Sequence, residues 1–230
     1  MSSLSTALNE PVISGPFSLY EGSFILEFLK PDPSRNASVL MRCTYKHDHH
    51  LCRKGKGHPQ SPPLHLHFNQ SESFTVLSGS VGTTHTWSAT DHIWTPADGI
   101  VTIEPWKPHT FWADGNATED TTILLWAHPD GTEDDMDRAF FHNILFYVSD
   151  LHEGKAKMDP FQLMLMQHAT ATAMVWFPRA WFLGPIRWWL PYQIQTAFAG
   201  VARLMGKESL IRKYTSDDDW KKLQEAKKAK

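Results

Sequence analysis

The sequence is poor in cysteine, has no surplus of basic residues and begins without an export signal. Its two cysteines, Cys43 and Cys52, are too few for a disulfide framework, which favours a reducing compartment. With 22 basic and 25 acidic residues in a chain of 230, the formal net charge is −3, which argues against a dedicated nucleic-acid-binding protein. The N-terminus has neither a basic segment nor an apolar core. We therefore predict a cytoplasmic protein with no nucleic-acid partner.

Long apolar runs and internal repeats are also missing. Residues 161–177 carry no formal charge, but this segment is shorter than the roughly 20 residues that a membrane span needs, and it contains glutamine, histidine and threonine. The lack of a repeat excludes solenoids and propellers. What the chain does have is 41% apolar and 12% aromatic residues, enough for a sizeable core, so a disordered or fibrous chain is excluded.

The first part of the chain is typical of β-structure interrupted by turns. Strands are expected within residues 17–29, 39–45, 64–68, 73–77, 81–87, 100–103, 109–112 and 121–127. Short strands at such close spacing predict a sandwich or a barrel. The composition changes at about residue 131, and helices are expected at 134–150, 161–177 and 192–205. We predict a β-barrel domain over 1–130 and a helical extension over 131–230.

The helical extension is rich in tryptophan. Trp181, Trp188 and Trp189 lie beside Arg179 and Arg187, a combination similar to the aromatic and basic belt of proteins that lie on a membrane surface. A second interpretation is that these aromatic side chains pack against the β-domain or against another subunit. The extension is therefore expected to form a lid, a dimer contact or a membrane-facing surface.

The stretch from His65 to Glu72 carries the clearest chemical signal. Residues two apart on a strand point to the same face, so His65 and His67 present neighbouring imidazoles. A short turn then brings Glu72 to the start of the next strand, and His109 lies where a returning strand could complete the set. Three neutral imidazoles and one carboxylate suit Fe(II), Mn, Ni, Cu or Zn, whereas Ca and Mg prefer oxygen ligands. We predict one divalent transition-metal ion.

This pattern resembles the motifs of the cupin superfamily over residues 16–129. The spacing from His65-x-His67 through Glu72 to Gly79 reproduces the first cupin motif, although Gly57 lies two residues too far upstream. In the second motif His109 matches the ligand. Glu104, Trp106 and Ala113 stand where cupins usually have proline, glycine and asparagine. The resemblance implies a mainly β fold, a single cupin barrel (double-stranded β-helix or jelly roll), followed here by the α-helical C-terminal region, and metal ligands at His65, His67, Glu72 and His109.

Further residues are candidates for catalysis and substrate contact. His85 lies on a strand of suitable parity to face the barrel interior, where it could support a metal ligand, contact the substrate, shuttle a proton or simply be a hydrogen-bonded core histidine. Glu104 lies five residues before His109 and could act as a base or orient a ligand. Trp87, Trp106 and Trp112 fall in the barrel region and are candidate pocket residues, which favours an apolar substrate.

The sequence thus predicts a metal-dependent cupin enzyme that acts on an apolar, aromatic or polyketide-like small molecule. The chemistry that the resemblance implies is Fe(II)-dependent oxygenation. A non-redox isomerase, cyclase or decarboxylase, with or without metal, is the alternative, and a non-catalytic ligand-binding cupin is the third. By resemblance to other single-domain cupins, a homodimer is expected.

Overall fold

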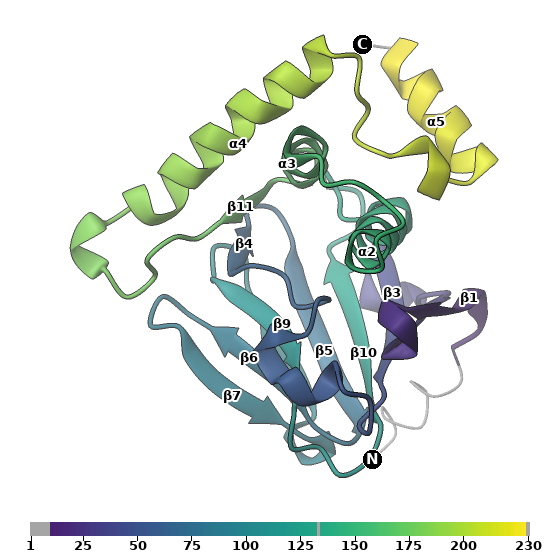
Figure 1. Cartoon of the computed structure of the whole chain (residues 1–230), viewed down its shortest axis with the longest axis vertical. Helices are drawn as coiled ribbons and strands as arrows, with labels where there is room; N and C mark the ends of the chain where they lie inside the picture. The colour runs from purple at the N-terminus through teal and green to yellow at the C-terminus, as the bar shows by residue number, and fades with distance from the viewer. Residues whose placement is uncertain (1–9, 133, 229–230) are drawn as a thin grey trace.

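The computed structural model describes residues 10–132 and 134–228, and these form two antiparallel β-sheets with helices across one end (Figure 1). One sheet has six strands in the order β1-β2-β3-β10-β5-β8, and the other has five in the order β11-β4-β9-β6-β7. The strands are β1 (Val12–Leu19), β2 (Phe24–Leu29), β3 (Val39–Tyr45), β4 (His65–His67), β5 (Ser71–Ser78), β6 (Val81–His85), β7 (Thr90–Trp94), β8 (Ile100–Ile103), β9 (His109–Ala113), β10 (Thr121–His128) and β11 (Thr172–Met174). The predicted β-barrel with a helical C-terminal region is confirmed.

The main core fills the space between the two sheets, as strand alternation requires. On β10, Ile123, Leu125 and Ala127 belong to this core, whereas Leu124 and Trp126 form a smaller cluster on the opposite face of the sheet. Successive side chains on a strand point to opposite faces, so both faces of this central strand are buried. That double burial explains why residues 121–127 read as a continuous apolar run.

Four helices make up most of the C-terminal region: α2 (Arg138–His152), α3 (Pro160–His168), α4 (Ile186–Leu204) and α5 (Asp217–Lys228). Asp137 and Asp159 each accept a hydrogen bond at the start of a helix, from the backbone amides of Phe140 and Gln162. The apolar side of α2 packs on the main core, and α3 follows it across the same end of the barrel (Figure 1). Among the described residues no helix is both long and apolar enough to cross a bilayer.

Two sequence predictions for this region were wrong in part. The helix expected over 161–177 ends at His168, and Thr172–Met174 instead forms β11, which pairs with β4. The helix expected over 192–205 is α4, which begins earlier, at Ile186, and contains Pro191. Proline lacks the amide that would bond to the carbonyl of Arg187, and that carbonyl accepts a hydrogen bond from the Trp176 amide at 2.8 Å instead.

The strand predictions need smaller corrections. The run 17–29 is divided by a short 3-10 turn, Tyr20–Gly22, into the end of β1 and the whole of β2, and β7 was not expected. Because β11 belongs to the C-terminal region yet pairs with β4, the two predicted regions share a sheet. A separate domain boundary at residue 130 stays a prediction.

Candidate metal centre

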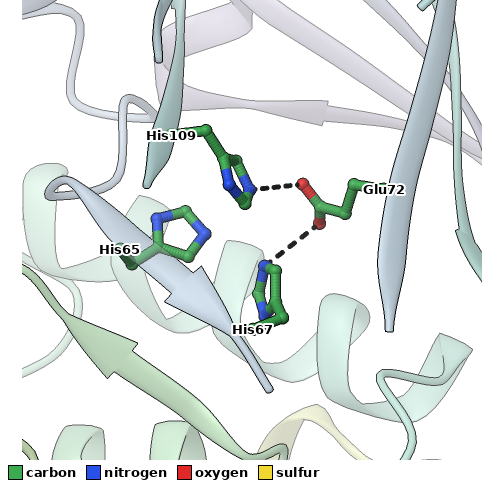
Figure 2. A group of neighbouring side chains, drawn as sticks. All are labelled: His65, His67, Glu72 and His109. Atoms are coloured by element: carbon green, nitrogen blue, oxygen red, sulfur yellow. Dashed lines mark hydrogen bonds and ion pairs between the residues drawn. The ribbon is translucent and has the colours of Figure 1, made fainter. Parts of the chain in front are cut away.

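Four side chains from three strands converge inside the barrel (Figure 2). His65 and His67 project from the same face of β4, Glu72 begins β5, and the register between β4 and β9 pairs His65 with His109. One ligand atom from each of these four residues lies within 4.8 Å of all the others. The structure therefore brings together the whole predicted ligand set, and metal binding itself stays a prediction.

Each imidazole is oriented by a hydrogen bond on its outer nitrogen. Nδ1 of His65 bonds to the carbonyl oxygen of Pro63 at 2.9 Å, and Nδ1 of His109 bonds to that of Lys107 at 2.9 Å. A carbonyl oxygen can only accept, so both Nδ1 atoms carry the proton. Nδ1 of His67 bonds to the hydroxyl of Thr172 at 3.0 Å. All three rings are thereby fixed, as is usual for metal-ligating histidines.

The inner atoms of the cluster are mostly acceptors that face other acceptors. Nε2 of His109 lies 3.0 Å from one carboxylate oxygen of Glu72, and Nε2 of His67 lies 3.7 Å from the other. In a neutral imidazole whose Nδ1 is protonated, Nε2 carries a lone pair. Nε2 of His67 is also buried and has no hydrogen-bond partner among the described residues. Buried lone pairs that point at one another are costly, and a cation between them removes that cost.

The ionisation of the site matches what a metal ion needs. Burial lowers the pKa of His65 to about 4 and holds the pKa of His67 well below its usual range, so both rings are neutral. Burial acts to raise the pKa of Glu72, but the close approach of His109 and of the His67 and His65 imidazoles outweighs it and lowers this pKa to about 2. Neutral imidazoles and an ionised carboxylate are the forms that bind metal. The donor set fits a first-row transition ion.

The cluster lines a cavity of about 570 Å³ between the barrel and the helices. The lining is mainly apolar and comes from both sheets and from α2 and α3. It includes Phe24, Met41, Phe111, Ile123, Leu125, Met136, Phe140, Phe141, Ile144, Leu145, Val148, Leu163, Met164 and Met174. Besides His67, two lining residues have a buried polar atom without a partner among the described residues, Oγ of Ser61 and Oε1 of Gln167. The cavity is thus an apolar chamber with a few polar positions.

The three tryptophans that we predicted to line the pocket lie elsewhere. On β9, Phe111 lines the cavity, so Trp112 between Phe111 and Ala113 faces the other side of the sheet, where its indole donates to Thr84. Trp87 follows the end of β6 and lies under the guanidinium of Arg187. Trp106 is 46% exposed and contacts Phe68 and Trp188. The apolar lining comes instead from phenylalanine, methionine and aliphatic residues.

The two predicted catalytic residues also lie outside the cavity lining. His85 is directly opposite His109 in the β6–β9 register, which puts both on one face of the sheet, and its ring lies near those of His92 and Trp94. Glu104 is exposed and accepts a hydrogen bond from Ser71 at 3.1 Å. The described residues around Glu104 do not connect it with the cluster, so a role as a base at the metal is not supported.

Sequence reasoning missed the helical part of the cavity. Phe140, Ile144 and Val148 have the spacing of one face of a helix, but this spacing does not indicate that the face closes the barrel over the histidines. Thr172 was assigned to a helix, so its bond to His67 was not expected. Both features depend on how distant segments pack together.

Comparison with known proteins identifies relatives among fungal enzymes. No family model matches the chain. The probable oxidoreductase virH of Hypocrea virens is 31% identical over 173 residues, which cover 74% of this chain and 75% of that protein. An oxidoreductase of Arthrobotrys oligospora is 29% identical over 212 residues and covers 89% and 78% of the two chains. The epoxidase atD of Aspergillus terreus is 28% identical over 212 residues, which cover 87% of this chain and 63% of that protein.

Solved structures resemble the chain only distantly. A Klebsiella pneumoniae protein with a double-stranded β-helix domain matches 57% of this chain and 86% of its own length, at 16% identity and a TM-score of 0.36. The match to virH extends over most of both proteins. It shows that this chain belongs to the same oxidoreductase family as virH, and the two-sheet barrel with its cluster of three histidines and Glu72 is the arrangement that the cupin resemblance implies.

Proposed function

We propose that this enzyme is a metal-dependent oxygenase that acts on an apolar small molecule, with Fe(II) held by His65, His67, Glu72 and His109. The observation that carries the proposal is the position of the cluster: three oriented Nε2 atoms and one carboxylate lie in the wall of an apolar chamber of about 570 Å³. A chamber of this size and character suits a drug-sized apolar molecule. We take the substrate to be aromatic or polyketide-like.

The choice of Fe(II) over other ions rests on chemistry. Zinc has no accessible redox change, so a zinc site would not suit an oxidoreductase. Iron, manganese, nickel and copper all fit nitrogen and carboxylate ligands. When bound, a redox-active ion would supply the electron transfer to O₂ that protein side chains cannot provide. One relative is named an epoxidase, which agrees with oxygen insertion as the reaction class.

The side chains of the chamber supply binding and orientation. Phe111 and Leu125 from the barrel and Phe140 from α2 surround the substrate with apolar surface and exclude water from the cluster. Oε1 of Gln167 and Oγ of Ser61 can receive hydrogen bonds from a substrate hydroxyl. The hydroxyl of Thr172 keeps the His67 ring turned toward Glu72. We therefore expect a substrate with a large apolar body and at least one hydroxyl group.

Metal content and oxygen uptake test this proposal. The full chain would be purified without added metal or chelator, analysed by mass spectrometry and then loaded anaerobically with Fe(II), Mn, Ni, Zn or Cu. We expect near-stoichiometric metal in the wild type, and none in the His65→Ala, His67→Ala double variant. With Fe(II) we expect oxygen uptake in the presence of phenolic or β-dicarbonyl compounds.

Product mass separates oxygenation from the alternatives. A product that gains one or two oxygen atoms supports the proposal, whereas a product of unchanged mass indicates an isomerase or cyclase. The loss of carbon dioxide without oxygen uptake indicates a decarboxylase. If the wild-type protein binds none of the five metal ions, the result contradicts the proposed metal centre.

A further inference from the structure

A group of large apolar side chains is exposed between β11 and the first turns of α4. Phe177, Trp181 and Phe182 are 71%, 79% and 73% exposed. Such side chains are rarely left in water together unless they meet a partner. We call this surface the aromatic tip; its residues are Phe177, Trp181, Phe182, Ile186, Trp189 and Leu190.

The exposed apolar surface continues along α4. Gln195, Ala199 and Ala202 are buried on the inner side of this helix, which contacts α3. Val201 and Leu204 lie on the other side and are exposed, Leu204 by 90%. Figure 1 shows α4 running along the periphery of the molecule, and this helix contacts α3 and β11. The aromatic tip and the outer side of α4 thus form one elongated surface.

The aromatic tip is held in place by hydrogen bonds behind it. Arg179 donates to the carbonyl oxygens of Ser88 and Ala89 at 3.1 and 3.2 Å. Arg187 donates to the carbonyl oxygens of Gly184 and Pro178, and its guanidinium lies 4.3 Å from the ring centre of Trp87. These contacts use the backbone and the two arginines, and they leave the rings of Trp181 and Phe182 free. The protein therefore presents these rings to the outside in a defined conformation.

The charge of this segment differs from that of the whole chain. Residues 160–207 contain no aspartate or glutamate and four basic residues, Arg179, Arg187, Arg203 and Lys207, whereas the chain has a net charge of −3. Lys207 pairs with Asp159 at 2.5 Å, and Arg203 is exposed. An apolar aromatic surface on a segment that carries cations and no acidic residue is complementary to an anionic lipid surface.

We infer that the aromatic tip and the outer side of α4 dock on the surface of an anionic lipid bilayer. Tryptophan and phenylalanine side chains lie favourably at the boundary between headgroups and acyl chains, and nearby arginines interact with anionic headgroups. Because no described helix is suited to cross a bilayer, the contact is peripheral. A second copy of the chain is the other candidate occupant of this surface, and the test below distinguishes it from a bilayer.

Vesicle binding by the full chain tests the inference. Co-sedimentation would be measured with vesicles of phosphatidylcholine alone and with vesicles that also contain phosphatidylserine, and tryptophan fluorescence would report insertion. We expect binding that strengthens with phosphatidylserine and weakens with salt. Trp181→Ser with Phe182→Ser should reduce the partition coefficient roughly tenfold or more, since both apolar side chains are lost from the contact. Arg203→Gln should reduce binding to the anionic vesicles about fivefold.

Control variants remove exposed groups of the same kind from elsewhere on the protein. Ile93→Ser with Ile100→Ser removes two exposed apolar side chains from β7 and β8, and Lys30→Gln removes an exposed cation after β2. Both controls should bind vesicles as the wild type does. Wild-type protein that binds neither vesicle overturns the inference. The inference is also overturned if analytical ultracentrifugation shows that the wild type and the control variants form a dimer, whereas the Trp181→Ser, Phe182→Ser variant does not.

Discussion

The hydroxyl of Thr172 lies 3.0 Å from Nδ1 of His67, a residue 105 positions earlier in the chain. The bond is made possible by β11, which places Thr172 opposite His67 on β4. The same hydroxyl lies within hydrogen-bond reach of the Thr170 carbonyl, so it can donate there and accept from His67. The segment between α3 and α4 therefore orients a ligand of the barrel. This relationship connects the helical region directly to the candidate metal centre.

Thr172→Val should weaken metal binding without unfolding the barrel. Valine keeps the side-chain volume but cannot accept a hydrogen bond, so the His67 ring loses the contact that fixes its orientation. The loss of such an outer contact reduces metal affinity by about 10- to 100-fold. Competition with a chromophoric chelator would measure the change. Thr75→Val is the matched control, because the Thr75 hydroxyl is buried and has no partner among the described residues. Equal metal affinity in the Thr172→Val variant and the wild type would contradict this role.

Gln167→Leu should stabilise the empty protein and impair substrate binding. Oε1 of Gln167 is buried in the cavity wall and has no partner in the part of the chain that the structure describes, which costs about 1 kcal/mol or more. Leucine removes that cost, so the denaturation midpoint in urea should rise. With a substrate identified by oxygen uptake, KM should rise because the proposed hydrogen bond is lost. Met164→Leu, at an apolar position of the same wall, should change neither quantity much. A lower urea midpoint for Gln167→Leu would argue against this assignment.

The ligands of the candidate centre could be predicted because they follow from local rules. His65 and His67 share a face through the two-residue period of a strand, and Glu72 follows after one turn. The strand 109–112 was expected, and its parity already separates Trp112 from His109. The same rule, applied to Trp112, would have excluded it from the pocket. Trp87 and Trp106 lie beyond strand ends, where parity gives no guidance.

The rest of the site depends on contacts between distant segments. Residues 172–174 form a strand because β4 offers a free edge, although their local sequence continues an apolar run that also suits a helix. The helix expected over 192–205 was predicted to begin only after Pro191, but the Trp176 amide satisfies the carbonyl that proline leaves free, and α4 begins before it. The docking of α2 over the histidines is a tertiary contact of the same kind. None of these three features has a signal within a short window of sequence.

Gly82→Ala should destabilise the barrel through the outer face of the sheet. A Cβ atom at Gly82 would overlap the ring of Trp112, which lies across this position from the neighbouring strand. Trp112 is nearly buried, so the ring must shift, and overpacking of this kind costs about 1–3 kcal/mol. Urea denaturation would measure the loss. Gly200→Ala in α4, where an added methyl meets no neighbour, should be neutral or stabilising. Destabilisation by both variants would show that the Trp112 contact is not the cause.

His58 should make the stability of the protein fall below neutral pH. Its ring is 2% exposed; Nδ1 accepts from the Gln60 amide, and Nε2 lies 2.9 Å from the Ser23 hydroxyl. Both partners suit a neutral ring, and burial lowers the pKa of His58 to about 4. An unfolded chain takes up this proton near pH 6.5, whereas the folded protein does not. Folding is therefore disfavoured increasingly as pH falls from 6.5 toward 4, with a slope approaching about 1.4 kcal/mol per pH unit from this residue.

The variant His58→Gln isolates that contribution. A glutamine side chain can accept from the Gln60 amide and donate to Ser23, but it does not titrate. Urea denaturation of both proteins at several pH values between 7 and 4 should give a shallower decline for the variant, although His65 and His67 continue to contribute in both. The difference should be absent at pH 7, where neither folded nor unfolded chain carries much charge at this position. Parallel curves across the whole range would show that the buried ring of His58 does not limit stability in acid.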